Sequence, residues 1–219
     1  MPTLIAIDGL DGSGKGTQSR LLYEALTARG IDARLISFPV YDSPSCALVK
    51  LYLSGALGKD PDAVNCYAAS SFYAMDRFAT FKQDWKKDYD AGTVIIADRY
   101  TTANAIHQLT KLPEAERASF LEWLSDFEYN KLAIPAPDLT LFLEVPVEMS
   151  LDLIDERGRE GDIHENRDHL LRAFDAAQYA CRAWGWEKIV CVKEGALLSR
   201  QEISEEILKR VKAHLPHLC

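Results

Sequence analysis

Five short apolar runs are spaced along the chain, and longer segments with a different pattern separate them. Continuous apolar runs of this length are typical of strands in a parallel sheet that is covered on both faces. They lie at residues 3–8, 33–38, 93–97, 138–144 and 188–193. Between them, apolar residues recur with helical spacing near residues 15–29, 44–54, 62–90, 101–128, 146–157, 166–184 and 200–214. The alternation predicts a three-layer α/β fold, with a five-stranded parallel sheet between helices on both faces.

The link between the first strand and the first helix is a glycine-rich loop with a lysine. Residues 9–17 read Gly-Leu-Asp-Gly-Ser-Gly-Lys-Gly-Thr. Glycines let the backbone curl until several N–H groups face one anion, and the helix that follows adds the positive end of its dipole. This context is typical of a phosphate-binding loop, in which Lys15 reaches the terminal phosphates. We expect the loop to hold ATP through Asp11, Gly12, Ser13, Gly14, Lys15, Gly16 and Thr17.

The third strand runs directly into Asp98-Arg99-Tyr100. Ligands of open parallel sheets lie at the carboxyl ends of the strands. Asp98, together with the hydroxyl of Thr17, therefore becomes a candidate for holding Mg²⁺, and Arg99 a candidate for a second phosphate. The alternative is that Asp98 caps the next helix and Arg99 pairs with a neighbouring acid.

Composition excludes several classes of protein. The 219 residues carry a formal net charge of −8, which argues against a general nucleic-acid binder. No apolar run approaches the roughly 18 residues that a membrane span needs, so we expect no membrane partner. Met1 leads within two residues into the first strand, and we expect no signal peptide. The five cysteines are scattered without metal-ligand spacing, which is typical of reduced cytoplasmic thiols.

The loop carries one further acid, and with it a resemblance. Residues 8–15, Asp-Gly-Leu-Asp-Gly-Ser-Gly-Lys, resemble the phosphate loop of the thymidylate kinase family of P-loop nucleoside-monophosphate kinases. The resemblance covers nearly the whole chain and implies one P-loop kinase domain over residues 1–219. In that family the acid that corresponds to Asp11 faces the 3′-hydroxyl of the substrate deoxyribose. A turn-forming aspartate in front of Gly12 is the alternative.

The same resemblance extends to the residues around the substrate base. Phe38-Pro39 is similar to the pair that shapes the wall of the base pocket. Tyr73 would stack on thymine and Arg77 would bond a ring oxygen; their i, i+4 spacing fits one helix face. A core aromatic residue and a surface arginine would show the same spacing. Asn104 and Gln108 are also four apart and would face the base with their amides. We expect the neighbouring His107 to be structural.

Two segments depart from the family pattern. Many members carry an arginine next to the Phe-Pro pair, where it holds the monophosphate, but here Ser37 and Val40 flank the pair. Arg99 would then carry more of that role. The expected lid, near residues 156–165, contains Arg157 and Arg159, of which Arg157 is the better candidate for a catalytic arginine finger. The alternative is that both only pair with the acids beside them.

The resemblance implies a cytoplasmic homodimer that transfers the γ-phosphoryl group of Mg·ATP to dTMP. Two other readings stay open at this point. One is a kinase for deoxynucleosides or for another nucleoside monophosphate, because the missing arginine suits an uncharged acceptor. The other is a homologue that binds the nucleotide without catalysing transfer.

Overall fold

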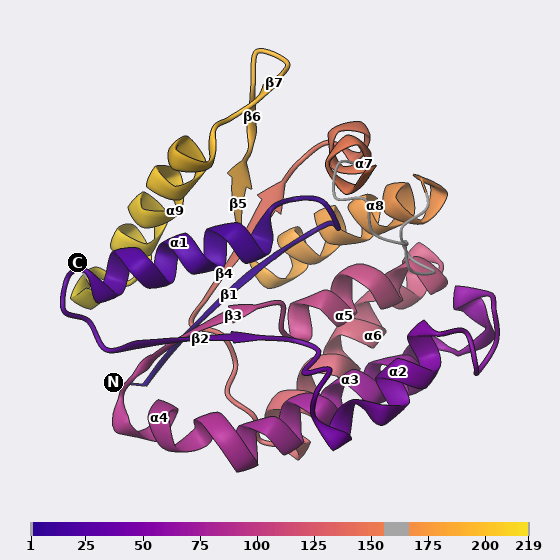
Figure 1. The fold of residues 1–219 in the computed structure, drawn as a ribbon. Helices are drawn as coiled ribbons and strands as arrows, with labels where there is room; N and C mark the ends of the chain where they lie inside the picture. Colours follow the sequence, from indigo (N-terminus) through magenta and orange to yellow (C-terminus); the bar gives the residue numbers. More distant parts are fainter. Residues whose placement is uncertain (1, 156–166, 219) are drawn as a thin grey trace.

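A computed structural model describes residues 2–155 and 167–218 of the chain. Its main sheet has five parallel strands in the order β2-β3-β1-β4-β5 (Figure 1). The pairing of Ile5 with both Ile96 and Leu139 places β1 at the centre of the sheet. The expected five-stranded parallel sheet is therefore confirmed. The strands are β1 (Thr3–Gly9), β2 (Ala33–Ser37), β3 (Val94–Asp98), β4 (Leu139–Glu144) and β5 (Glu187–Val190).

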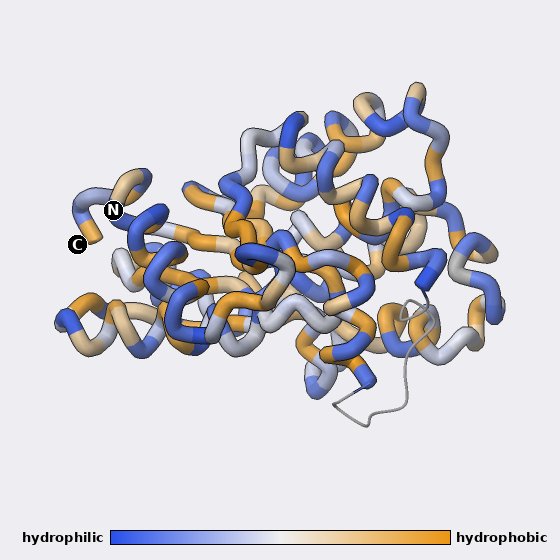
Figure 2. Tube along the Cα trace, turned by 90° about the horizontal axis from the view of Figure 1, so that it is seen from above, coloured by the Kyte–Doolittle hydropathy of each residue, from blue (hydrophilic) through white to orange (hydrophobic). Residues whose placement is uncertain are grey.

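Helices cover both faces of this sheet, as the alternating pattern predicts. They are α1 (Lys15–Thr27), α2 (Ala47–Leu53), α3 (Cys66–Thr80), α4 (Lys86–Ala91), α5 (Thr101–Gln108), α6 (Glu114–Ser125), α7 (Val147–Asp155), α8 (Arg167–Trp184) and α9 (Arg200–His214). In Figure 1, α1 and α9 lie on one side of the sheet, and α3, α5 and α8 on the other. Hydrophobic and hydrophilic residues alternate along the helices, as expected where one side of each helix is buried (Figure 2).

The central strand shows how the sheet divides the core. Ile5 and Ile7 pack with Leu22 of α1 on one face, whereas Leu4 and Ala6 pack with Trp85 on the other. Successive side chains of a strand point to opposite faces, so a continuous apolar run is what a strand covered on both sides requires. Burial of both faces fixes the register of β1 and thereby the position of the loop that follows it.

The helix expected at 101–128 is interrupted, and that prediction is wrong. α5 ends at Gln108, a 3₁₀ turn follows over Leu109–Lys111, and α6 starts only at Glu114. Pro113 stands at the N-cap of α6 in an extended conformation. Proline cannot donate a helical hydrogen bond, and it favours extended backbone in the residue before it, which here is Leu112. The periodicity is correct on both sides of this break.

Two further boundaries differ from the sequence pattern. The helix expected at 62–90 begins at Cys66, where Asn65 caps it, and continues from α3 through a π-helical segment (Phe81–Trp85) into α4. A second π-helical segment, Asp126–Lys131, extends α6. The last predicted strand divides into β5 and a small antiparallel hairpin of β6 (Val192–Lys193) and β7 (Ala196–Leu197). The expected lid and its two arginines lie outside the described residues.

Within the described ranges, no helix is both long and apolar enough to cross a membrane. The four described cysteines are free and buried.

Candidate functional site

The loop between β1 and α1 has the backbone that a phosphate cradle needs. Gly12 and Gly14 have φ of 84° and 83°, which side-chain-bearing residues adopt only with strain. A Cβ atom at Gly12 would also lie 2.2 Å from the carbonyl oxygen of Ser150 in α7. The Ser13 amide donates to the Leu10 carbonyl at 3.1 Å and closes the turn. Only glycine fits position 12, for steric as well as conformational reasons.

Lys15 lies at the start of α1 with its ammonium group folded back into the loop. Its Nζ donates to the Leu10 carbonyl at 3.1 Å and to Asp11 Oδ1 at 3.3 Å. Burial lowers the pKa of Lys15, and the nearby charge of Arg99 lowers it further, although Asp11 partly opposes both. The fold thus keeps the Lys15 ammonium group in an environment that disfavours its charge. Such shifted pKa values are common at sites that bind an anionic ligand.

Arg99 contacts Asp11 across the mouth of the loop, because its Nη2 donates to Asp11 Oδ1. Its backbone has φ of 66°, in the left-handed region that arginine rarely adopts. Burial works to raise the pKa of Asp11, but the charges of Arg99 and Lys15 outweigh it and hold that pKa well below its usual value. Burial would lower the pKa of Arg99, but Asp11, Asp8 and Asp98 together raise it. Both groups are therefore fully charged at neutral pH.

Asp98 ends β3 directly opposite the start of α1. Its Oδ2 accepts a long hydrogen bond of 3.5 Å from Ser37, and its Oδ1 is buried without a partner among the described residues. A Cβ atom at Gly16 would lie 3.0 Å from Asp98 Oδ2. A glycine therefore stands where phosphate loops usually carry a hydroxyl residue, and Thr17 supplies the hydroxyl. An orphaned carboxylate oxygen and a threonine that line the same cavity suit Mg²⁺, which prefers oxygen ligands and retains several waters.

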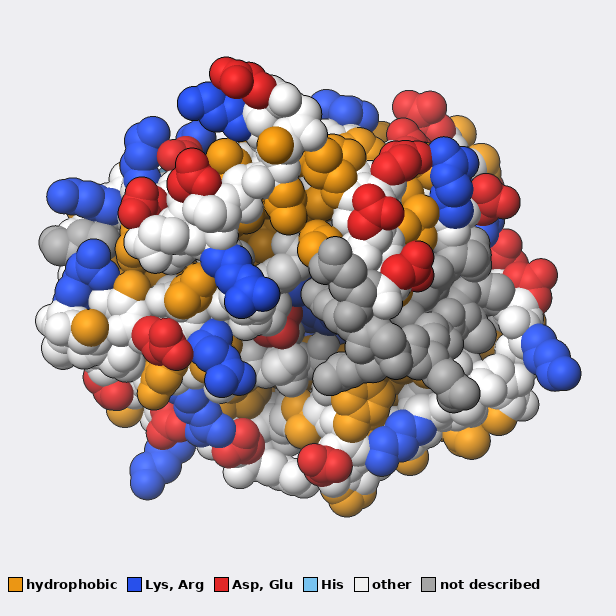
Figure 3. All heavy atoms as spheres, turned by 45° about the horizontal axis from the view of Figure 1, so that its top comes forward, with side chains coloured by type: hydrophobic (Ala, Val, Ile, Leu, Met, Phe, Trp, Pro, Cys, Tyr) orange, Lys and Arg blue, Asp and Glu red, His pale blue; other side chains and the backbone are white. Residues whose placement is uncertain are grey.

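Two cavities meet at this point. One, with about 1270 Å³ of empty space, lies over the phosphate loop and is lined by Lys15, Thr17 and Asp98, among others. The other, with about 550 Å³, extends between α3 and α5. Asp11 and Arg99 line both. In Figure 3, basic and acidic side chains lie in a hollow that hydrophobic side chains border.

The second cavity contains the side chains that the sequence suggests for a base. Phe38, Tyr73, Arg77, Asn104 and Gln108 all line it. Gln108 is 1% exposed, and its Oε1 has no partner among the described residues, although it is buried. The structure thus brings these five residues together. Their contacts with a nucleotide remain a prediction.

Phe38 and Pro39, which form one wall of this cavity, are joined by a cis peptide bond. The buried carboxylate of Asp76 in α3 fastens the loop that follows. It accepts from the Val40 amide at 2.8 Å and from Ser45 Oγ at 2.6 Å. The sequence analysis missed this residue, although an acid at a buried position of a helix needs partners and is a usable signal.

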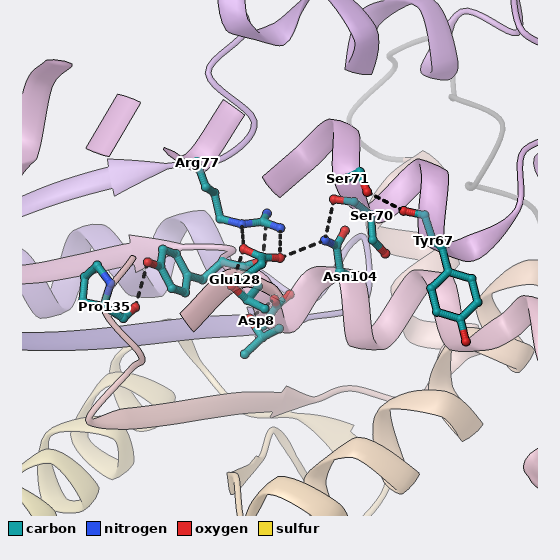
Figure 4. Close-up of polar contacts among 11 residues, drawn as sticks. Asp8, Tyr67, Ser70, Ser71, Arg77, Asn104, Glu128 and Pro135 are labelled. Carbon is teal, nitrogen blue, oxygen red and sulfur yellow. Dashed lines mark hydrogen bonds and ion pairs between the residues drawn. The ribbon is translucent and has the colours of Figure 1, made fainter. Parts of the chain in front are cut away.

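Arg77 is not a surface arginine, since it is 1% exposed. Its Nε and Nη2 donate to the two oxygens of Glu128 at 2.7 and 2.6 Å (Figure 4). Asn104 of α5 donates to the same carboxylate at 3.2 Å. The sequence analysis missed Glu128, which lies in the second π-helical segment, in a stretch where charged residues follow one another without an obvious motif.

His107 also lines the cavity, so it is closer to the site than a structural residue needs to be. Its Nε2 lies 3.3 Å from Arg99 Nη1, and its Nδ1 lies 3.4 Å from Nε2 of the fully buried His169. The two imidazole rings are stacked, with ring centroids 5.7 Å apart. His107 therefore connects Arg99 to α8.

A glycine-rich anion cradle at the carboxyl edge of a parallel sheet, with a cation at the next strand, defines a P-loop nucleotide-binding protein. The model of the thymidylate kinase family matches residues 7–206. The chain belongs to the thymidylate kinase family, whose members phosphorylate dTMP.

Individual proteins agree with this assignment. A thymidylate kinase of Mycobacterium tuberculosis (strain H37Rv) is 30% identical over 197 residues, which cover 85% of this chain and 90% of that protein. A probable thymidylate kinase of Pyrococcus abyssi is 29% identical over 213 residues, 96% of each chain. The structure of thymidylate kinase from Candida albicans matches with a TM-score of 0.66 at 21% identity, covering 96% of this chain and 91% of that one. The last comparison supports the fold alone.

Proposed function

We propose that this protein transfers the γ-phosphoryl group of Mg·ATP to dTMP, yielding ADP and dTDP. The observation that carries the proposal is the wall that the two cavities share. Asp11 and Arg99 line both the cavity over the phosphate loop and the cavity between α3 and α5. A donor triphosphate in the first and an acceptor monophosphate in the second would meet at these two side chains.

In this arrangement the protein acts mainly through position and charge. The acceptor oxygen of dTMP is already anionic, so the transfer needs no strong base. Lys15 would contact the phosphoryl group in transfer, and Arg99 would hold the acceptor phosphate with its planar donors. Asp11 would orient the sugar of the acceptor. Binding of the acceptor at Arg99 replaces one anion, Asp11, by another, which keeps the arginine charge compensated.

Magnesium, when bound, neutralises charge on the transferring phosphates. Thr17 and Asp98 would hold the ion, the aspartate through its orphaned Oδ1. Within residues 2–155 and 167–218 no cluster of three or more His, Cys, Asp or Glu side chains is arranged to bind a metal. Ligands from the nucleotide and water would therefore complete the shell. Arg157, in the expected lid, remains our candidate for an arginine finger.

The proposal is tested by an ADP-release assay with Mg·ATP against dTMP, dUMP, other nucleoside monophosphates and thymidine. Selective turnover of dTMP is the expected result. Turnover of thymidine alone would instead identify a deoxynucleoside kinase. Binding of ATP without transfer to any of these acceptors would identify a non-catalytic homologue.

We further infer a cytoplasmic homodimer that does not bind nucleic acid. The net charge of −8 disfavours a polyanionic partner. Exposed apolar side chains on α2 and α3, namely Leu48, Leu51, Tyr67 and Met75, offer a surface that a second copy would cover. Sedimentation analysis tests the dimer; a single species of 24.5 kDa would contradict it.

A further inference from the structure

We propose that Glu128 is a positioning residue that sets which bases the protein accepts. It would do so by fixing the orientation of Asn104 and Arg77, so that the cavity presents one acceptor and one donor to the edge of a pyrimidine. The inference rests on the proposed function, because it assigns the cavity between α3 and α5 to the base of the acceptor nucleotide. Glu128 itself need not touch that base.

The carboxylate of Glu128 is fully occupied. Its Oε1 accepts from Arg77 Nη2 at 2.6 Å and from Asn104 Nδ2 at 3.2 Å. Its Oε2 accepts from Arg77 Nε at 2.7 Å and from Thr101 Oγ1 at 2.8 Å. The residue is 0% exposed. An ionised carboxylate has about four acceptor sites and no donor, so Glu128 can be satisfied only by groups that turn N–H or O–H toward it.

The orientation of the Asn104 side-chain amide follows from this requirement. Its Nδ2 donates to Glu128 Oε1 and to the carbonyl oxygen of Ser70, each at 3.2 Å (Figure 4). Both partners accept only, so the nitrogen must be the atom between them, and both of its hydrogens are used. The side-chain oxygen is the polar atom left for a ligand. Asn104 lines the cavity and therefore offers an acceptor to it.

Arg77 supplies the opposite polarity. Glu128 binds its Nε and Nη2, and the Tyr100 carbonyl accepts from its Nη1 at 3.3 Å. A guanidinium has five N–H donors and these contacts use three of them, so further donors remain on a residue that lines the cavity. The paired carboxylate holds the plane of the guanidinium fixed.

An acceptor next to a donor matches one kind of pyrimidine edge. Thymine and uracil carry a hydrogen on N3 and an oxygen at C4, whereas cytosine has an acceptor at N3 and an amino group at C4. Cytosine would place acceptor against acceptor and donor against donor. The geometry thus selects 4-oxo pyrimidines. It owes this selection to Glu128 together with the Ser70 carbonyl, because two partners that only accept leave the Asn104 amide no alternative orientation.

The test is Glu128→Gln. Glutamine has an amide that can donate to Asn104 Oδ1, so only the Ser70 carbonyl still requires the Asn104 nitrogen. The Asn104 amide can then turn at the cost of that one hydrogen bond and present its nitrogen to the base. We expect the preference for dTMP over dCMP, measured as a ratio of kcat/KM, to fall about tenfold or more. The preference for dTMP over dUMP depends on the methyl group at C5 and should not change. Loss of both preferences together would indicate general damage and would overturn the proposal, as would an unchanged dTMP-to-dCMP ratio.

Two matched variants separate orientation from stability. Glu128→Asp shortens the side chain but keeps it an acceptor without donors, so it should lose stability and retain the preference for dTMP over dCMP. An equal loss of that preference in Glu128→Asp and Glu128→Gln would contradict the proposal. Glu122→Gln, at an exposed position of α6, should change neither quantity.

If Glu128→Gln does not fold, Asn104→Ala tests the acceptor that Glu128 is proposed to orient, and Glu128→Asp tests the orientation itself. Asn104→Ala removes the acceptor, so dTMP should bind about tenfold more weakly while dCMP binding changes little. Equal weakening of both would overturn the proposal. Calorimetric binding of dTMP, dUMP and dCMP without ATP makes these ratios measurable even without transfer. Absence of transfer by the unsubstituted protein would overturn the proposed function alone.

Discussion

Arg99 and Arg77 both line the cavity between α3 and α5, each paired with an acid, and the two pairs are built differently. Asp11 and Arg99 keep 15% and 22% of their side-chain surfaces exposed, with Lys15 as a third charge beside them. Glu128 and Arg77 keep 0% and 2%, and the carboxylate has every acceptor site filled. Arg99 can give up its contact with Asp11 for an anionic ligand, because both side chains are partly exposed. Arg77 and Glu128 cannot separate without leaving a buried charge unpaired.

The largest expected effect comes from removing Lys15 or Arg99, the two cations beside Asp11. Lys15→Met and Arg99→Met should each lower turnover by about a thousandfold or more, because each loses a charge that would stabilise the transferring or accepting phosphate. Lys15→Met should not lose thermal stability, since burial and Arg99 already disfavour the ammonium in the folded protein, as its lowered pKa shows. Lys50→Met, at an exposed position of α2, is the matched control. Unchanged turnover in either cation variant would remove that residue from the mechanism.

Breaking the buried pair of Arg77 and Glu128 should mainly lower the stability of the folded protein. Arg77→Met leaves the carboxylate of Glu128 buried without its counter-charge and should lower the free energy of unfolding by about 3–5 kcal/mol. Arg34, which pairs with Asp84 and Asp88 nearer the surface, provides the comparison. Arg34→Met should cost about 1 kcal/mol or less in the same urea titration. Similar losses in the two variants would show that the buried pair of Arg77 and Glu128 is no costlier to break than an ion pair nearer the surface.

The pH dependence of stability tests whether Arg99 keeps Asp11 ionised in the folded protein. The pKa of Asp11 is depressed in the folded protein, so its contribution is present above the unfolded value of about 3.9 and is lost as the pH falls through the folded pKa. Arg99→Met removes a main cause of that depression and also raises the pKa of Asp8, which Arg99 lowers against burial. The unfolding free energy of Arg99→Met should therefore fall less steeply between pH 5 and pH 3 than that of the unsubstituted protein. Equal slopes would mean that Arg99 does not hold Asp11 ionised.

The smallest expected effect comes from Gly16, which lies next to the proposed magnesium ligands Thr17 and Asp98. Gly16→Ala places a methyl group at 3.0 Å from Asp98 Oδ2, so the carboxylate must shift by a few tenths of an ångström. We expect turnover to fall about threefold to tenfold, with a weaker dependence on Mg²⁺ as the readout of a displaced ligand. Thr17→Ser keeps the hydroxyl, adds no atom near Asp98 and should behave normally. A Gly16→Ala variant with an unchanged magnesium titration would place the ion elsewhere.

The sheet and the phosphate loop were predictable because local patterns determine them. Apolar runs of a buried strand and glycines with positive φ leave a signature in the residues themselves. The break at Pro113 is also visible in the sequence, but apolar spacing that continues on both sides of it conceals the break from a search for helical periodicity. By contrast, Glu128 joins Arg77 and Asn104 from 51 and 24 positions away. Such a contact depends on how three helices pack, and no single stretch of sequence encodes it.

The carbonyl oxygen of Ser150 occupies the space that a side chain at position 12 would need, so the backbone of α7 rests directly on the phosphate loop. Any tightening of that loop around an anion must be transmitted to α7 as a change in its own mobility. Hydrogen–deuterium exchange over residues 147–155 should therefore slow when ATP is added, although no side chain of α7 lines the cavity over that loop. A helix outside the pocket becomes a natural reporter of whether the pocket is filled.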